Sequence, residues 1–516
     1  MDKKVLCLLL FALVLRLAGM SFFLPYDGIH PRENFTISHS INYLTTGNLK
    51  PYDFQHPTFG QYLITFFSFL AFLPQFISSR EVFVEHVISN YALVYLIGRI
   101  LSVLASFLAV FVVYLAGVKL KDRMTGFFAA LFIGSNFLAI KFAHYVTPDS
   151  LALLFVSLSL LYALFVFKGL IFDHLIVCGL FSGFALGSKF SGFISLGYFF
   201  IAYIFFLKKK GPGLKFLLLP ILAIFIGFFL SSPFHIISFK EFLRDAGNYL
   251  AERGFAGVSV SSLRYSGLFE YPFVLIPLGF SAFGYIFFYV GSIMLFVKRE
   301  RFKFILIVLP LVVYFLALSK ERAATPRNVL LTLPSLSLGA AYFFSWLRDK
   351  KLYKTLIFLV IIALSLQVAK AIVFDCFLFK KDTRILAKEW ITNNIDKQKS
   401  IAFEPYTPLD LNQIERSNLT LFYDTAYIVP SLAVNPPRFY REKGFDYIVT
   451  SGVREREYSF NCQRERSCLY ADNYSSFAKE FELVAQFRPP KIFNITAFPF
   501  WGIWPHNPTV KIYRVK

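Results

Sequence analysis

Charged residues are scarce in this 516-residue chain, at 16% of the total, where a typical soluble domain has about 25%. Hydrophobic residues make up 56%, and they gather in blocks, two of which, 101–118 and 355–369, contain no charge. A membrane span needs about 20 mostly apolar residues. The composition therefore argues against an ordinary soluble protein and predicts a polytopic α-helical membrane protein.

Acidic residues are few as well: 32 Asp and Glu stand against 53 Lys and Arg, for a net charge of +21. Such an excess can indicate nucleic-acid binding, but the basic residues here lie in short loops between apolar blocks. Lys and Arg in such loops mark the cytoplasmic side of a membrane protein. We therefore predict no nucleic-acid partner and interpret the charge as a signal of topology.

Cysteines number only five. The sequence also has no evident internal repeat, and this argues against an inverted-repeat transporter. Cys462 and Cys468 lie in a polar tail, where a disulfide is open to them if the tail faces an oxidising compartment. The first 20 residues resemble a secretory signal but lack a small-residue cleavage site, so we expect a retained first span.

The apolar blocks predict eleven spans, and the block 61–77 is the ambiguous one. If 61–77 does not cross, and the N-terminus is cytoplasmic, every short, strongly basic loop falls on the cytoplasmic side. We therefore expect 61–77 to be an interfacial helix on the outer face. The predicted spans lie near 5–23, 91–117, 124–142, 149–167, 173–188, 190–207, 216–232, 271–297, 304–318, 329–346 and 355–374.

This topology predicts a transmembrane domain over 1–375, with a long outer loop over 24–90, and a C-terminal domain over 376–516. The C-terminal domain is expected to be extracytoplasmic and α/β, with a helix over 384–394 and strands over 400–403, 447–449 and 510–515. The protein is thus expected in the cell membrane, multi-pass, with a cytoplasmic N-terminus.

Ionisable residues at span mouths are costly and are functional candidates for that reason. The first outer loop begins with Asp27, Arg32 and Glu33, in which a carboxylate can serve as a general base or simply be a solvated loop acid. The second group, His144, Tyr145 and Asp149, ends one span and starts the next. Asp149 is either an N-terminal helix cap or the second carboxylate of an acid/base or metal site.

Outer cations form a third group. Lys189 lies between two apolar blocks, where a lipid phosphate or simple snorkelling would explain it. Arg322 and Arg327 lie in another outer loop, and Arg is well suited to phosphate through its planar fork, although a solvated loop is the alternative. His56, ahead of the interfacial helix, is a further candidate.

Five segments, taken in order, resemble the GT-C membrane glycosyltransferases, the relatives of protein O-mannosyltransferases and of the aminoarabinose transferase that modifies lipid A. The resemblance covers most of 1–395. It rests on HPREN (His30–Asn34), HPTFGQYL (His56–Leu63), AHYVTPDSLALLF (Ala143–Phe155), GFALGSKFSGF (Gly183–Phe193) and ATPRNVLLTLPSLSLGAAY, which contains Arg327.

The resemblance implies a polyprenyl-phosphate-linked sugar donor and a protein, lipid or glycan acceptor on the non-cytoplasmic face. Glu33 would take the acceptor proton, and Asp149 would orient the acceptor or help bind a metal. Lys189 and Arg327 would stabilise the departing phosphate, while His56 and His144 would line the cavity. A divalent metal on Glu33 and Asp149 is compatible with this, but no ligand spacing specifies a cofactor.

The sequence departs from the family at Arg32, which stands where the first acid of the usual Asp-Glu pair is expected. Either Glu33 serves alone, or Asp27 substitutes, or activity is altered or lost. Arg32 would make Glu33 a weaker base or would itself contact phosphate. The alternatives are a catalytically silent homologue that binds a lipid-linked glycan, and a lipid or solute transporter, which predicts charges buried in mid-span.

Overall fold

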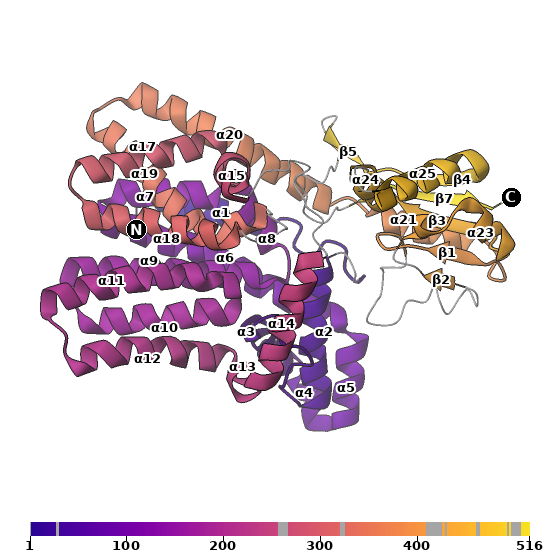
Figure 1. The fold of residues 1–516 in the computed structure, drawn as a ribbon, viewed down its shortest axis with the longest axis horizontal. Helices are drawn as coiled ribbons and strands as arrows, with labels where there is room; N and C mark the ends of the chain where they lie inside the picture. Colours follow the sequence, from indigo (N-terminus) through magenta and orange to yellow (C-terminus); the bar gives the residue numbers. More distant parts are fainter. Residues whose placement is uncertain are drawn as a thin grey trace. The chain divides into compact units, whose positions relative to one another are not determined.

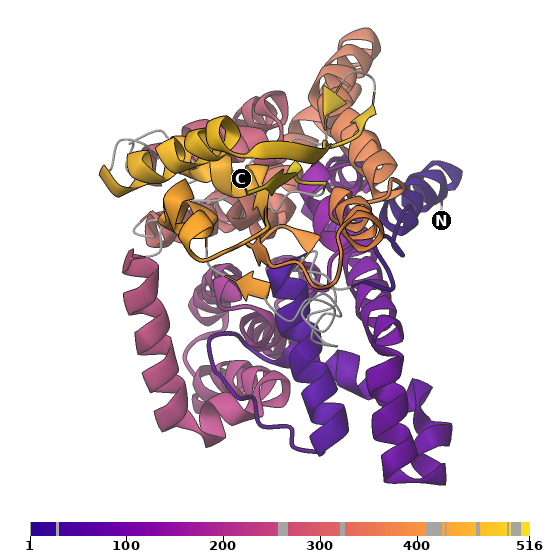
Figure 2. The ribbon, with the colours of Figure 1, turned by 90° about the vertical axis from the view of Figure 1, so that its right-hand side faces the viewer.

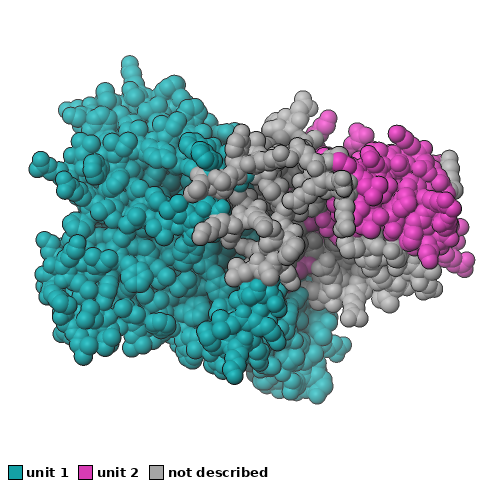
Figure 3. Space-filling model, viewed as in Figure 1, with its two compact units in different colours: residues 1–20, 35–372 teal, residues 21–34, 373–516 magenta. Residues whose placement is uncertain are grey.

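The computed structural model describes residues 2–26, 30–255, 267–319, 326–408, 426–428, 431–460, 465–492, 495–496 and 507–515. Its chain divides into two compact units, coloured in Figure 3: Met1–Met20 with Phe35–Ile372, and Ser21–Asn34 with Val373–Lys516. We call them the membrane unit and the C-terminal unit. The predicted partition at residue 375 did not anticipate that 21–34 groups with the C-terminal residues.

The fold class predicted from sequence is confirmed: the membrane unit is built of apolar helices (Figures 1 and 2). Among the described residues, seven helices are long and apolar enough to cross a membrane, or nine if two bent pairs count as one span each. The seven are α6 (Tyr91–Leu120), α9 (Pro148–Gly169), η1 with α11 (Phe190–Lys210), α12 (Leu214–Ser231), α18 (Arg301–Leu318), η3 with α19 (Pro326–Asp349) and α20 with α21 (Tyr353–Asn394).

Two of the eleven predicted spans fall on shorter helices, α1 (Lys3–Leu17, 15 residues) and α10 (Phe172–Ser188, 17 residues). The predicted first span, 5–23, included the turn that follows α1, whereas the predicted span 173–188 coincides with α10, which is itself a short helix. The remaining helices of the membrane unit are α2 (Pro31–Thr46, whose first turn falls in the C-terminal unit), α3 (Phe59–Ala71), α4 (Leu73–Ser78), α5 (Arg80–Ser89), α13 (Pro233–Ile237), α14 (Phe239–Phe255) and α15 (Gly267–Glu270).

The two bent pairs are α7 (Arg123–Gly134) with α8 (Phe137–Ala143), bent by 60°, and the helices over Tyr271–Phe280 with α17 (Ala282–Val297), bent by 110°. Asn136 joins the two breaks, because its side chain caps α8 and donates to the Gly279 carbonyl at 2.9 Å. Buried Arg16 donates to the carbonyls of Gly134 (2.9 Å) and Ile133 (3.3 Å). Backbone groups freed inside a membrane need such partners.

The block 61–77 forms two short helices, α3 and α4, that break at Phe72. At about 1.5 Å per residue, the 13 residues of α3 extend about 20 Å, well short of the roughly 30 Å hydrocarbon core of a bilayer. α3 is held from α2, since the Tyr43 hydroxyl donates to Gln61 Oε1 at 2.9 Å. The length of α3 therefore agrees with the interfacial helix predicted from charge.

Helices α9 to α12 lie side by side in Figure 1, and α10 packs closely on α12 through glycines. A Cβ atom at Gly183 would lie 2.2 Å from the Ile224 carbonyl oxygen, and one at Gly227 would lie 2.3 Å from the Leu180 carbonyl oxygen. No side chain fits at either position. This contact fixes the far end of α10, where Lys189 follows.

One end of the membrane unit gathers two of the basic loops predicted to be cytoplasmic. Lys121 Nζ lies 2.6 Å from Asp349 Oδ2, and Arg348 Nη2 lies 3.1 Å from Asp122 Oδ2. Asp122 also caps α7 through the Thr125 amide. The loop after α6 and the loop after α19 thus meet, as the charge pattern requires.

The C-terminal unit carries a five-stranded sheet in the order β2-β1-β3-β7-β4. The strands are β1 (Ile401–Phe403), β2 (Ala426–Ile428), β3 (Tyr447–Ser451), β4 (Glu482–Phe487) and β7 (Val510–Arg514), and a separate hairpin pairs β5 (Lys491–Ile492) with β6 (Ile495–Thr496). The first three strands are parallel, and β7 is antiparallel to β3 and β4. The three predicted strands correspond to β1, β3 and β7.

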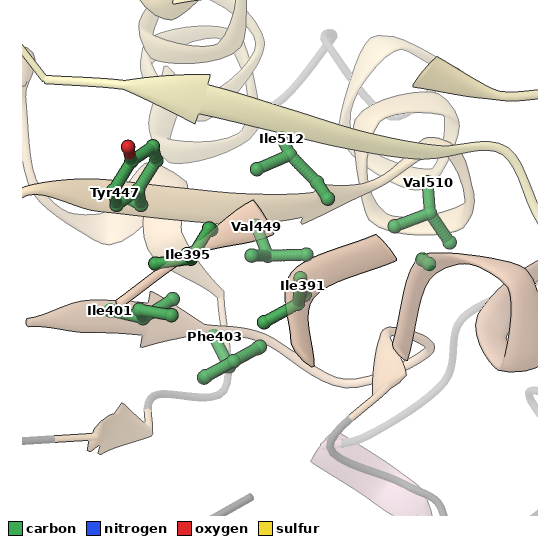
Figure 4. Close-up of a cluster of buried hydrophobic side chains, with 9 residues drawn as sticks. Ile391, Ile395, Ile401, Phe403, Tyr447, Val449, Val510 and Ile512 are labelled. Carbon is green, nitrogen blue, oxygen red and sulfur yellow. The ribbon is translucent and has the colours of Figure 1, made fainter. Parts of the chain in front are cut away.

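Helix α21 (Thr383–Asn394) covers one face of the sheet, with Ile391 packed in the apolar cluster of Figure 4. It also holds the 21–34 segment: the Arg384 Cζ atom lies 5.0 Å from the Phe23 ring centroid, and the Lys388 Nζ atom lies 5.2 Å from the Tyr26 ring centroid. The other helices of this unit are α23 (Pro437–Glu442), α24 (Gly452–Phe460) and α25 (Glu465–Glu480).

Cysteine pairing agrees in part with the sequence. Cys468 is disulfide-bonded, whereas Cys7, Cys178 and Cys376 are free thiols. Cys462, the predicted partner of Cys468, lies outside the described residues.

Glu404 is a fully buried carboxylate at the end of β1. It accepts hydrogen bonds from the Ser451 amide (2.6 Å), the Leu432 amide (2.9 Å) and the Tyr474 hydroxyl (2.6 Å). Burial raises the pKa of the Glu404 carboxyl to about 7. The carboxyl therefore joins β1, β3 and α25 and titrates near neutral pH.

The packing of α10 predicts that Gly183→Leu separates α10 from α12 and destabilises the protein, because a side chain there meets backbone. Its melting temperature in detergent should fall by several degrees, following the roughly 1–3 kcal/mol typical of overpacking. The matched control is Gly60→Leu on α3, where no atom lies within 4 Å of an added Cβ. Equal melting temperatures for the two variants would contradict the close contact.

Glu404 predicts a pH dependence in the C-terminal unit. Above a pH of about 4.3 the unfolded chain releases this proton, while the folded unit keeps it up to about pH 7. The contribution of the protonated Glu404 carboxyl to the free energy of unfolding is thus complete below about pH 4.3. It is lost as pH rises through about 7, and it amounts to on the order of 3 kcal/mol in total. The protection of the β1 and β3 amides against hydrogen exchange, measured in the full chain, should decrease as pH rises from 5 to 8. The decrease should be smaller in Glu404→Gln. An identical pH slope in this variant would assign the effect elsewhere.

Candidate active site

Asp149 lies in the first turn of α9 and has no exposed side-chain surface. Thr147, not Asp149, is the N-cap residue of this helix, and Pro148 occupies its first turn. The carboxylate is bonded instead by side chains from two other elements. Asp149 therefore does not cap its own helix, which was the simpler of the two interpretations of its sequence position.

Lys189 and Arg327 both bind this carboxylate. Lys189 Nζ lies 2.7 Å from Asp149 Oδ1, and Arg327 Nε lies 3.0 Å from Oδ1 and 3.1 Å from Oδ2. The Arg327 Nη2 atom makes a further short hydrogen bond to Oδ2. The Arg327 guanidinium also stacks on a ring, with its Cζ atom 5.1 Å from the Phe142 centroid. We call Asp149, Lys189 and Arg327 the ionic triad.

Local structure brings the triad together from distant parts of the chain. α9 and α10 are antiparallel neighbours joined by a short turn, so the first residue of α9 and the last residue of α10 lie at the same end of the pair. Lys189 is the C-cap of α10, extended in backbone conformation before η1 (Phe190–Phe193). Arg327 lies in η3 (Pro326–Thr332), a 3₁₀ turn that leads into α19. The predicted residues Asp149, Lys189 and Arg327 thus form one cluster.

The charges of the triad are unequally exposed. The Asp149 side chain is 0% exposed, whereas those of Lys189 and Arg327 are 19% and 20% exposed. A buried carboxylate alone would be strongly unfavourable, so the two cations are what allow it to remain charged. With two cations to one carboxylate, the triad carries excess positive charge on its accessible side. That surface is suited to an anion.

Both carboxylate oxygens of Asp149 accept hydrogen bonds from cations, which favours a role in holding Lys189 and Arg327 over a role as proton acceptor. Within the described residues, no group of three or more His, Cys, Asp or Glu side chains is placed to hold a metal ion. We therefore derive no step through a metal.

The predicted histidines lie elsewhere in the membrane unit. His144 bridges two backbone carbonyls, Ile140 at 2.9 Å and Ala18 at 2.7 Å, and so ties α8 to the turn after α1. Tyr145 beside it is buried. The His56 ring lies 5.3 Å from the Phe35 ring on α2. Their proposed roles as ligands stay predictions.

The remaining candidates are Asp27, Arg32 and Glu33 of the segment after α1, and Arg322 of the segment before η3. Glu33 lies in the first turn of α2, where a negative charge favours the helix dipole. Arg32 precedes it in the same turn. Asp27 and Arg322 lie outside the described residues. Glu33 belongs to the C-terminal unit and Asp149 to the membrane unit, so their pairing stays a prediction.

Two features of the site were missed from the sequence. Phe142 supports Arg327, which no spacing rule indicates. His39 on α2 stacks on Tyr52 with ring centroids 3.7 Å apart, and its Nε2 atom lies 3.8 Å from Asp53 Oδ2. The signal for the second feature was an aromatic and charged cluster in a loop otherwise treated as a connection. It orders the segment between α2 and α3.

Comparison with known proteins gives the fold. Residues 92–237 match the family model of dolichyl-phosphate-mannose-protein mannosyltransferases. The Archaeoglobus fulgidus oligosaccharyltransferase superposes with a TM-score of 0.55 at 13% identity, over 94% of this chain and 73% of that one. The chain has the fold of the GT-C membrane glycosyltransferases. Among curated proteins, none matches this sequence.

Two structures with this GT-C fold contain lipid phosphates. One is AglB of Archaeoglobus fulgidus, in complex with an inhibitory peptide and a dolichol-phosphate (TM-score 0.54, 14% identity, 94% of this chain and 73% of that one). The other is ArnT of Cupriavidus metallidurans bound to undecaprenyl phosphate (TM-score 0.50, 13% identity, 98% of this chain and 97% of that one). The GT-C resemblance predicted from the sequence motifs is confirmed at the level of the fold.

The ionic triad predicts that Asp149→Asn strongly destabilises the protein, because two cations lose their shared carboxylate. Breaking a buried ion pair from one side typically costs about 3–5 kcal/mol. Thermal unfolding in detergent would measure the loss. The matched control is Asp173→Asn, an exposed aspartate in the first turn of α10. A loss no larger than that of the control would mean that the triad is not formed.

Proposed function

We propose that this protein is an inverting glycosyltransferase whose donor is a sugar linked to a polyprenyl phosphate, acting on the non-cytoplasmic face of the membrane. The observation that carries the proposal is the ionic triad, in which a fully buried Asp149 holds two partly exposed cations at the mouth of α9. The GT-C fold supports it, as do the lipid phosphates bound by two proteins that share this fold.

Lys189 and Arg327 suit the phosphate of such a donor. Guanidinium offers a planar set of N–H donors that matches phosphate oxygens, and ammonium adds a compact charge. Asp149 is a positioning residue in this proposal, since its carboxylate fixes both cations before substrate binds. Donors that are already oriented cost no reorganisation when negative charge develops on the leaving phosphate.

The reaction is a displacement at the anomeric carbon. The acceptor oxygen or nitrogen forms a bond to that carbon as the bond between the carbon and the phosphate oxygen breaks. The lipid phosphate leaves with the electron pair, and Glu33 accepts the acceptor proton. One displacement inverts the configuration of the sugar. Asp27 is the substitute base if Glu33 is too weak beside Arg32.

Orientation in the membrane is part of the proposal. The opposite ends of α9 to α12 carry the triad and the lysine-rich turn Lys208–Lys210, respectively. Lysine-rich turns favour the cytoplasm, so the proposal has the triad on the outer face. The C-terminal unit is expected to be extracytoplasmic from the charge pattern of the sequence alone. The acceptor there is a protein, lipid or glycan.

A silent homologue that binds lipid-linked glycan without transfer is the second candidate, because Arg32 replaces an expected acid. The two candidates differ at Glu33: a transferase needs its carboxylate, whereas a binding protein does not.

Arg327→Gln and Lys189→Gln should weaken binding of undecaprenyl or dolichyl phosphate, because each removes a charge that faces the phosphate. Loss of one such donor should also slow transfer by about 10²–10³-fold. Native mass spectrometry of the purified chain measures binding, and a panel of radiolabelled polyprenyl-phosphate sugars measures transfer. Lys209→Gln, at the far end of α11, is the matched control.

Glu33→Gln separates chemistry from binding in the same assays. It should retain lipid-phosphate binding and lose transfer by about 10²–10⁴-fold. Full transfer by this variant would remove Glu33 as the base, and unchanged lipid-phosphate binding by Arg327→Gln would remove the triad as the phosphate site.

A further inference from the structure

The C-terminal unit contains a cavity of about 480 Å³, a size typical of small-molecule sites. Helix α24, the ends of β4 and β7, and the β5 hairpin enclose it. None of the predicted site residues lines it. Its lining residues are Gly452, Glu455, Arg456, Ser459, Gln486, Arg488, Pro489, Lys491, Thr509 and Lys511.

Regular secondary structure forms most of the wall of this cavity. Four of its residues share one face of α24, at the helical spacing of Gly452, Glu455, Arg456 and Ser459. Gln486 and Lys511 are cross-strand partners in the β4–β7 register. Gly452 lets α24 approach β7 closely, since its amide donates to the Thr509 carbonyl at 2.8 Å and a Cβ there would lie 3.0 Å from Thr509 Cβ.

Charge in the cavity is strongly positive. Four lining residues are cationic, and the described wall holds a single carboxylate, Glu455, which lies 2.7 Å from Lys511 Nζ. Arg488 donates to the neutral Gln486 side chain at 3.0 Å. Arg456, Arg488 and Lys491 have exposed side chains, whereas Lys511 is only 19% exposed. The cavity therefore presents cations to solvent, with its acid already paired.

Polar neutral groups accompany these cations. Ser459, Gln486 and Thr509 offer hydroxyl and amide groups that both donate and accept hydrogen bonds. Such groups suit sugar hydroxyls, while the two arginines suit a planar or tetrahedral anion. A simple inorganic ion would leave most of the volume empty.

We propose that this cavity binds an anionic saccharide, a sugar that carries a carboxylate, sulfate or phosphate. It is a glycan-recognition site in the C-terminal unit, separate from the ionic triad. The inference rests on the residues of this cavity and not on the proposed transfer reaction. In a transferase, the site would select acidic acceptors or retain acidic products.

The test measures binding to the full chain in detergent, without any donor lipid. The probes are three disaccharides that end in glucuronic acid, glucose 6-sulfate or mannose 6-phosphate, together with a neutral glucose-terminated disaccharide and sodium phosphate. We expect at least one acidic probe to bind at least 10-fold more tightly than both the neutral disaccharide and sodium phosphate. Failure of all three acidic probes, or equal binding by either reference compound, overturns the proposal.

Variants locate the binding. The double variant Arg456→Gln/Arg488→Gln should weaken binding of the acidic probe at least 10-fold, and Ser459→Trp should block it by filling the cavity without a change in charge. Lys479→Gln, an exposed lysine on α25, is the matched control and should bind as the wild type does. Wild-type binding by both cavity variants would also overturn the proposal. Because no transfer is measured, an inactive Glu33→Gln enzyme leaves this result intact.

Discussion

The buried carboxylate of Asp149 is the interaction on which the functional end of the membrane unit depends. It joins the start of α9, the end of α10 and the turn before α19 in one cluster. A buried ion cluster is weak support for stability, since desolvation offsets most of the attraction. What the cluster secures is geometry: two cations held in fixed positions where apolar helices end.

Other buried polar groups in the membrane unit have a structural purpose. Arg16 donates to the carbonyls at the break between α7 and α8, Asn136 donates to the Gly279 carbonyl beside the second break, and Arg99 donates to the Met20 carbonyl at 3.1 Å. Arg16 and Arg99 are charges buried inside predicted spans, which is the pattern that the transporter alternative predicts. Their bonds to backbone explain them as clamps on broken or terminating helices, so they no longer favour transport.

The C-terminal unit also contains a buried carboxylate that joins several elements, but its partners are different. Glu404, also buried, ties β1 to β3 and α25, but its partners are amides and a hydroxyl rather than cations. Burial raises the pKa of the Glu404 carboxyl despite these hydrogen bonds and the nearby Arg454 guanidinium, whereas Asp149 is bonded directly by two cations. Four cationic side chains of this unit line the cavity of α24, and three of them are exposed to solvent.

Pattern along the chain was sufficient to predict the membrane class, most helix positions and the charged residues of the ionic triad. Long apolar blocks have few folded alternatives, and a charge such as Lys189 or Arg327 at a span mouth is conspicuous because burial is costly. The positive loops also predicted that 61–77 does not cross the membrane, and this stays a prediction. These are local properties, and local pattern was enough to predict them.

Only the tertiary structure decided which of those charges meet. Asp149 could have been a helix cap, and its role became clear only when α10 and η3 brought Lys189 and Arg327 to it. The first span, predicted to reach residue 23, ends as a helix at Leu17. The cavity of α24 depends on a strand order that puts β7 between β3 and β4, so residues as far apart in the sequence as Gly452 and Lys511 share one wall. Such pairings arise from the way helices and strands stack, which no pattern along the chain records.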